Sequence, residues 1–104
     1  RHMRLAEGYI MANLDQPLTI EAIADAAGIS PRGLQLAFRQ HRDTTPLGFW
    51  RDQRLARAHG DLVAGAGSVT DIALRWGFGH FGRFAESYRA LWHEPARHVA
   101  GVAR

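Results

Sequence analysis

The sequence predicts an all-α fold of seven helices, in which two helix-turn-helix subdomains are joined by a long linker helix. Apolar residues recur at intervals of three and four along most of the chain, as on one face of an amphipathic helix. Pairs that begin helices, such as Ser30-Pro31 and Thr45-Pro46, stand between these segments. No stretch of useful length alternates apolar and polar residues as a strand does. The 104 residues suit a single domain, predicted over residues 4–104.

The first helix-turn-helix subdomain is predicted over residues 5–43. Leu5 and Tyr9 lie one turn apart in its first helix, which stops before the first proline of the chain. The hydroxyl of Thr19 can accept a hydrogen bond from a free N–H of the next helix and so caps it. One face of that second helix is apolar: Ile20, Ile23, Ala24 and Ala27. Gly28 ends the helix, because glycine adopts the left-handed conformation without steric penalty.

The third helix begins at Ser30 and Pro31, since serine caps a helix and proline fits its first turn. Leu34 and Phe38 lie one turn apart and form its inner face. Asp43 is the expected end of the helix, because aspartate tolerates left-handed geometry better than most residues.

The linker helix is predicted over residues 46–64, and Thr45-Pro46 opens it in the same way as Ser30-Pro31. Gly65-Ala66-Gly67 provides a flexible break after it. The linker's buried side is expected to carry five apolar residues: Phe49, Trp50, Leu55, Ala58 and Leu62.

The second helix-turn-helix subdomain is predicted over residues 68–100. Ser68, with Asp71 three residues later, resembles a capping box in which Asp replaces the usual Glu. Pro95 is well placed to begin a short last helix. Two inner faces are expected in this subdomain: Ile72, Ala73 and Trp76 on the fifth helix, and Phe84, Tyr88, Leu91 and Trp92 on the sixth.

A short internal repeat explains the glycines of residues 77–82, which read GFGHFG and have the spacing of a dinucleotide-binding turn. Residues 23–29 match residues 72–78: a helix with a small Ala meets a Gly, then an apolar residue, then a new helix. A cofactor turn needs a strand before it, whereas here a helix precedes Gly77. Gly77 is therefore predicted to be the turn glycine of a helix-turn-helix, and no nucleotide cofactor is expected.

Charge indicates an anionic partner. The formal net charge is +3, the pI is about 10.5, and all 13 basic residues are arginine, whose planar donors suit phosphate and guanine. The alternative is that these arginines only solvate the surface. Cysteine is absent, which excludes disulfides and thiolate metal sites. With no apolar run of membrane-spanning length and no recognisable signal peptide, a cytoplasmic protein is expected. Arg1-His2-Met3 resembles a cloning remnant and is left out of the predicted fold.

Residues 5–100 resemble the DNA-binding domain of the AraC/XylS family of bacterial transcription regulators. The resemblance rests on four motifs: Leu18-Thr19-Ile20-x-x-Ile23-Ala24; Ser30-x-x-x-Leu34-x-x-x-Phe38; Thr45-Pro46 followed by Arg54-Leu55-x-x-Ala58; and Val69-x-x-Ile72-Ala73-x-x-x-Gly77-Phe78 followed by Phe84. The chain departs from the family at Asp43, where Gly is usual, at Trp92-His93, where Phe-Gly is usual, and at Pro95, which comes about one residue early.

The resemblance implies a homeodomain-like pair of recognition helices that read two adjacent major-groove half-sites. A linker of about 18 residues at 1.5 Å per residue measures roughly 27 Å, in the range of the roughly 34 Å turn of B-DNA. The family also implies partners: double-stranded DNA, RNA polymerase, since its members are typically activators, and an additional N-terminal sensor or dimerisation domain. The operator, the effector and the choice between activation and repression stay open.

Six residues are expected to read bases. By resemblance, Arg32, Gln35 and Leu36 face the DNA, where Arg suits guanine, Gln suits adenine and Leu suits a thymine methyl. The start of the sixth helix is expected to expose the other three: His80, Arg83 and Glu86. Arg83 is the strongest reader among these, His80 reaches a phosphate or a base edge, and Glu86 faces a cytosine or orders Arg83.

Phosphate contacts are expected at helix N-termini, whose backbone N–H groups attract anions, and at exposed arginines. The predicted set is Thr19, Ser30, Arg39, Arg42, Thr45, Arg54, Ser68 and Arg89. Two alternatives stay open here. Arg54 pairs with Asp25 or Asp71 to hold the linker, and Phe81 packs against Trp76 or Phe78.

An enzyme is not expected. His93-Glu94 with His98 gives H-E-x-x-x-H, one residue longer than the zinc motif and interrupted by Pro95, so neither a metal site nor a catalytic site is predicted. The remaining alternative is a helical protein–protein interaction module without DNA specificity, which would use the region of Phe81 and Trp92 as an apolar patch.

Overall fold

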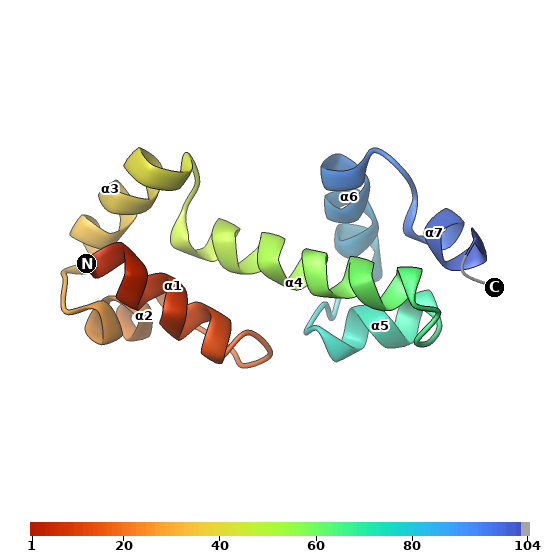
Figure 1. The fold of residues 1–104 in the computed structure, drawn as a ribbon, viewed down its shortest axis with the longest axis horizontal. Helices are drawn as coiled ribbons and strands as arrows, with labels where there is room; N and C mark the ends of the chain where they lie inside the picture. Colours follow the sequence, from red (N-terminus) through yellow and green to blue (C-terminus); the bar gives the residue numbers. More distant parts are fainter. Residues whose placement is uncertain (103–104) are drawn as a thin grey trace. The chain divides into compact units, whose positions relative to one another are not determined.

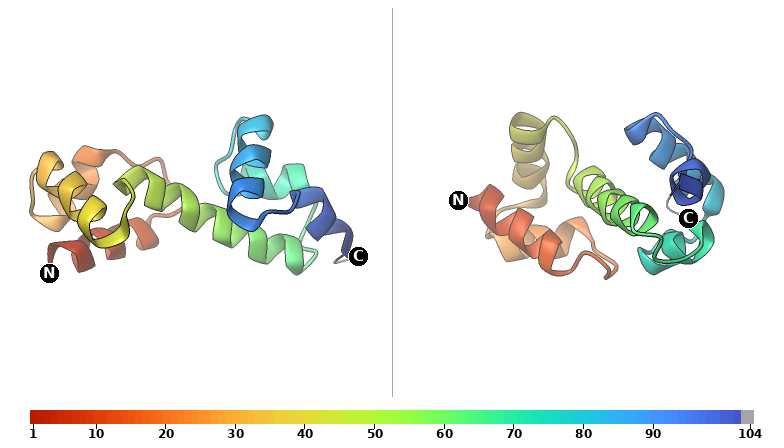
Figure 2. Two further views of the ribbon diagram at one scale, coloured as in Figure 1. Left: turned by 90° about the horizontal axis from the view of Figure 1, so that it is seen from above. Right: turned by 45° about the vertical axis from the view of Figure 1, so that its right-hand side comes forward.

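The computed structural model describes residues 1–102, and all regular structure in that range is helical, as the sequence predicts (Figure 1). The chain divides into two compact units, Arg1–Gln53 and Arg54–Arg104, and the boundary falls inside one continuous helix, α4 (Figure 2). The helices are α1 (His2–Ala12), α2 (Ile20–Ala27), α3 (Pro31–Arg42), α4 (Pro46–Val63), α5 (Val69–Arg75), α6 (Phe81–Trp92) and α7 (Ala96–Val102).

In the first unit, α1, α2 and α3 pack with the start of α4 around one apolar core. Phe38 and Phe49 meet at its centre, with ring centroids 5.6 Å apart. The indole N–H of Trp50 donates a hydrogen bond of 2.8 Å to the carbonyl of Leu14, which ties α4 to the end of the α1 segment. The buried apolar residues are Ala6, Ile10, Leu14, Leu18, Ile23, Ala24, Ala27, Leu34, Phe38 and Phe49.

Helix α1 starts earlier than the sequence predicts. It begins at His2, so residues left out as a remnant belong to the fold, and the His2 ring hydrogen-bonds the carbonyl of Ala27 over 2.8 Å. Its buried face carries Ala6 and Ile10, whereas Leu5 is 41% exposed. The faces of Leu5 and Ala6 are adjacent on a helix, and the small Ala6 side chain lets the backbones of α1 and α2 approach.

The predicted helix boundaries of the first unit are confirmed by their hydrogen bonds. The hydroxyls of Thr19, Ser30 and Thr45 each accept from the backbone N–H three residues later, over 3.1, 3.1 and 2.9 Å. Gly28 and Asp43 end α2 and α3 in the left-handed conformation, with φ of 69° and 53°. Local chemistry alone therefore fixes where α3 begins and ends.

The second unit repeats this plan with α5, α6 and α7 packed against the second half of α4. Ser68 caps α5, and Gly77 turns the chain with φ of 84°, as predicted. Leu91 and Trp92 were both expected on the inner face of α6. Trp92 packs against the core, whereas Leu91 is 43% exposed. The buried core consists of Leu55, Ala58, Leu62, Ile72, Ala73, Phe84, Tyr88, Ala96 and Ala100.

The last helix starts one residue after the predicted proline. Ala96 is its first residue, and the Pro95 carbonyl accepts from the N–H of His98 over 3.0 Å. His93 ends α6 in the left-handed conformation with φ of 58°, as Asp43 ends α3. Ala96, which is buried, therefore takes in the second unit the place that Pro46 has in the first.

Arg54 attaches α4 to the turn that follows α5. The guanidinium of Arg54 donates to the carbonyls of Trp76 and Gly77, over 3.2 and 3.4 Å, and lies 4.4 Å from the ring centroid of Phe78. The sequence suggested a carboxylate partner for Arg54, whereas these contacts are with the carbonyl groups that follow α5. Such carbonyls carry the negative end of a helix dipole, which attracts a guanidinium.

Candidate nucleic-acid interface

The outer face of α3 presents the predicted readers of the first unit. Arg32, Gln35 and Arg39 are exposed, and Leu36 is 58% exposed. Together with Thr45 these residues line a hollow of about 220 Å³ between α3 and the start of α4. Arg32 forms no ion pair with any of residues 1–102, so its planar donors stay available.

The start of α6 presents the predicted readers of the second unit, but His80 has a role that sequence reasoning missed. The His80 ring caps α6, because its Nδ1 accepts a hydrogen bond of 3.2 Å from the backbone N–H of Arg83. With Nδ1 as acceptor, a neutral ring carries its proton on Nε2. The side chains of Arg83 and Glu86 are exposed, and neither forms an ion pair within the described part of the chain.

Gly82 has a local structural reason. A Cβ at this position would lie 3.2 Å from Cε1 of His80. Glycine therefore leaves room for the imidazole that caps the helix, and it also removes the side chain from the outer surface of the first turn.

The caps set the register between the two recognition helices, which are 12 residues long in each unit. His80 caps α6 as Ser30 caps α3, and both helices end in a left-handed residue. This register equates four outer positions of α3 with four of α6: Arg32 with Gly82, Gln35 with Ala85, Leu36 with Glu86, and Arg39 with Arg89. The match of Ser30 with His80 was available in the sequence, since Leu34 and Phe84 already align.

The arginines predicted to contact phosphate differ in their surroundings. Arg39 lies 3.7 Å from the carboxylate of Asp43, and both side chains are largely exposed. Arg42 pairs with Glu7 of α1 and lies over the ring of Phe49. Arg89, in contrast, forms no ion pair with a described residue.

Four residues predicted to mark phosphate-binding helix N-termini all use their side chains as caps. The hydroxyls of Thr19, Ser30, Thr45 and Ser68 each accept a backbone N–H, as described above for the helix boundaries. Their phosphate contacts would therefore come from the remaining free N–H groups of each first turn rather than from the hydroxyls.

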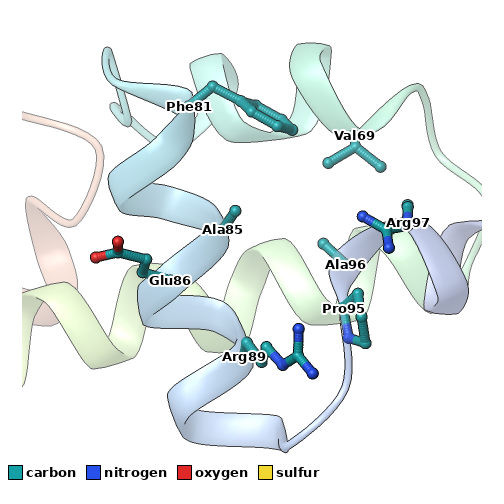
Figure 3. A pocket seen from close by; sticks show the side chains of 8 residues that line it. All are labelled: Val69, Phe81, Ala85, Glu86, Arg89, Pro95, Ala96 and Arg97. Atoms are coloured by element: carbon teal, nitrogen blue, oxygen red, sulfur yellow. The ribbon is translucent and has the colours of Figure 1, made fainter.

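A second hollow, of about 280 Å³, lies beside α6 and is bounded by α5 and the start of α7 (Figure 3). Phe81 stands at its edge with 51% of its surface exposed. The ring of Phe81 contacts that of Phe84, with centroids 6.3 Å apart. The hollow is lined by Val69, Phe81, Ala85, Glu86, Arg89, Pro95, Ala96 and Arg97.

Two other sequence motifs were considered, the glycines at 77–82 and the H-E-x-x-x-H pattern at 93–98. Neither forms a cofactor or metal site in the described residues. Gly77 follows helix α5, not a strand, so the glycines at 77–82 belong to a helix-turn-helix. Residues 1–102 contain no group of three or more His, Asp or Glu side chains placed to hold a metal ion. No helix of that range is both long and apolar enough to cross a membrane.

Two helix-turn-helix units with exposed recognition helices define a DNA-binding domain of the helix-turn-helix class. A family model described as a helix-turn-helix domain matches residues 23–100. A solved structure of a probable AraC family transcriptional regulator from Rhodopseudomonas palustris superposes with a TM-score of 0.93 at 39% identity, covering 99% of this chain and 97% of that chain. The chain belongs to the AraC family of transcription regulators, whose domain of this type binds DNA and is not an enzyme.

Curated relatives agree with this assignment. The chain is 41% identical over 90 residues to a probable thc operon regulatory protein of Rhodococcus erythropolis. This match covers 84% of this chain and 27% of that protein. It is 43% identical over 89 residues to XylDLEGF operon transcriptional activator 3 of Pseudomonas putida, covering 83% and 27% respectively. The chain therefore spans about a quarter of the length of these relatives.

Proposed function

We propose that this chain is the sequence-reading part of a transcription regulator and that α3 and α6 enter two adjacent major-groove half-sites. The observation that carries the proposal is the repeat of one scaffold. Each recognition helix follows a turn and a side-chain cap, ends in a left-handed residue and leaves its outer face exposed. A helix held in this way by its inner face presents its outer face to a groove.

In the first half-site, Arg32 donates to the O6 and N7 acceptors of a guanine, and Gln35 pairs with an adenine. Leu36 contacts a thymine methyl group. In the second half-site, Arg83 reads a base, and Glu86 accepts from a cytosine or orders Arg83. His80, which uses Nδ1 for the cap, has Nε2 left to donate to a phosphate or a base edge.

Phosphates are held by the N-termini of four helices and by arginines around the recognition helices. The N-termini lie at Thr19, Ser30, Thr45 and Ser68. Arg39, Arg42 and Arg89 supply side-chain donors. Arg54 contributes mainly by holding the turn before α6, because its guanidinium contacts that turn.

The wider biology is proposed from the relatives. One similar protein is named a transcriptional activator, and we propose activation through contact with RNA polymerase for this chain as well. Since the relatives are longer, we place a sensor or dimerisation domain elsewhere in the full protein. A regulator of this kind acts on the bacterial chromosome and therefore in the cytoplasm.

Selection of bound duplexes from a random pool tests the proposal. We expect enrichment of a site with two blocks of preferred bases, bound more weakly as salt rises because counterions are released from the phosphates. Arg32→Ala should weaken binding by about 1–3 kcal/mol and relax preference at one position of the first block. Arg4→Ala, outside both recognition helices, is the matched control. Without any enriched duplex, the protein–protein interaction module becomes the better description.

A further inference from the structure

We propose that the hollow beside α6 receives the 5-methyl group of a thymine in the second half-site. The second unit then combines this apolar contact with the hydrogen bonds proposed for Arg83 and its neighbours. This inference rests on the proposed function, because it assumes that α6 enters a major groove.

The wall of the hollow is apolar and open. Val69, Phe81, Ala85 and Ala96 contribute to it from three helices, and Pro95 contributes from the segment before α7. In Figure 3 the ring of Phe81 extends from the start of α6 toward Val69, and the methyl group of Ala85 points to the same side. Phe81 is the first residue of α6, and about half of its surface is exposed. The second unit therefore leaves this aromatic side chain partly uncovered.

The rim of the hollow is positively charged. Arg89 and Arg97 stand at its edge, and neither forms an ion pair with any described residue. Glu86 also borders the hollow, but in Figure 3 its carboxylate points away from Val69 and Ala96. An apolar wall with a cationic rim is complementary to DNA, where the thymine methyl is the apolar group of the major-groove base edges and phosphates flank it.

The repeat places this hollow where the first unit keeps its predicted readers. The hollow beside α3 is lined by Arg32, Gln35, Leu36, Arg39 and Thr45. In the register set by the caps, the same places in the second unit are held by Gly82, Ala85, Glu86, Arg89 and Pro95. Guanidinium and amide are thus replaced by glycine and alanine, which donate no side-chain hydrogen bonds and let α6 lie closer to the bases.

The test replaces thymine by uracil in the selected duplex, one position at a time. This change removes one methyl group and keeps Watson–Crick pairing. In the second block we expect one position at which uracil weakens binding about three- to tenfold, the range expected for burial of a single methyl group with its contacts. Phe81→Ala should bind the thymine and uracil duplexes equally, whereas Phe81→Leu should keep part of the preference.

Leu36→Ala is the matched control, since Leu36 is also exposed and lies on the other recognition helix. It should alter the response to uracil in the first block only. Arg89→Gln and Arg97→Gln should weaken binding to thymine and uracil duplexes by the same factor and reduce the salt dependence.

The outcomes separate this inference from the proposed function. If the wild-type protein selects a two-block site but tolerates uracil throughout the second block, the hollow serves another ligand and the inference is overturned while the function stands. The same holds if the uracil effect persists in Phe81→Ala. If no duplex is selected, the proposed function itself fails.

Discussion

Replacement of Asp61 by alanine should loosen the junction between α4 and the end of α5. One carboxylate oxygen of Asp61, Oδ2, accepts hydrogen bonds from the indole N–H of Trp76 and from the guanidinium of Arg75, each over 2.8 Å. The alanine variant removes both acceptor interactions and leaves a half-buried indole N–H without its partner. Because the turn before α6 follows Trp76 directly, this contact also helps to position the second recognition helix.

The magnitude follows from the two contacts. Loss of a charged acceptor by a partly buried donor costs about 1–3 kcal/mol. The ion pair with Arg75 adds less than about 1 kcal/mol, because the two side chains are 44% and 27% exposed and water screens their charges. We therefore expect the free energy of unfolding to fall by about 2 kcal/mol, most of it through Trp76.

The effect should depend on pH in a defined direction. The hydrogen bond from Trp76 lowers the pKa of Asp61 below its ordinary value of 3.8, with help from Arg75 and against desolvation, which raises it. A group whose pKa is lowered by folding stabilises the protein above its unfolded-state pKa. The difference in the free energy of unfolding between wild type and variant should thus be fully present at neutral pH. It should disappear as the pH falls through the lowered folded-state pKa of Asp61.

Urea unfolding followed by far-UV circular dichroism measures both effects. Asp52→Ala is the matched control on the same helix, since Asp52 pairs with its exposed neighbour Arg51 and should contribute less than about 0.5 kcal/mol. Equal losses of stability in the two variants would refute the reasoning. So would a difference for Asp61→Ala that stays constant down to the most acid pH at which the protein folds.

Substitutions at three positions probe the turn and the recognition helix of the second unit. His80→Ala should lower the free energy of unfolding by about 0.5–2 kcal/mol, and His80→Ser should restore it, because serine caps α3; a serine variant as unstable as the alanine variant in urea would exclude the capping role. Gly77→Ala should cost about 1–2 kcal/mol because its φ of 84° disfavours any side chain, and an unchanged urea midpoint would contradict this. Arg83→Ala should weaken binding of the selected duplex by about 1–3 kcal/mol with relaxed preference in the second block, and unchanged affinity in a titration would remove Arg83 from the readers.

The sequence predicts those parts of the fold that depend on neighbouring residues. Serine or threonine caps the start of a helix, and glycine ends one, through contacts with residues at most four positions away. Ser30 and Gly28 could therefore be assigned from their neighbours in the sequence. His80 was missed as a cap because imidazole is not a usual capping group, although the repeat places it opposite Ser30. Helical spacing also left open which of two adjacent faces is buried, and Leu91 was placed on the wrong one.

Contacts that join distant segments needed the three-dimensional structure. Asp61 and Trp76 are brought together by the turn between α4 and α5, and nothing in the periodicity of either helix indicates the pair. The contacts of Arg54 with two carbonyl groups were equally hidden, because a sequence does not show where backbone acceptors at a helix end will point. For the same reason the exposed residues of α3 and α6 could be named from their helix positions, but the hollow beside α6 could not.

The two units keep apolar residues at equivalent inner positions and side-chain caps at equivalent helix starts, whereas most of their outer positions differ in chemistry, and this has a physical cause. Leu34 and Phe84 hold equivalent places in two cores, where a change of volume or polarity lowers stability directly. The outer positions carry no such constraint from the fold, so Gln35 and Ala85 can occupy equivalent places without affecting either core. Recognition helices set by the same scaffold thus present different chemistry, and two unlike half-sites are the expected consequence for a monomer that carries both.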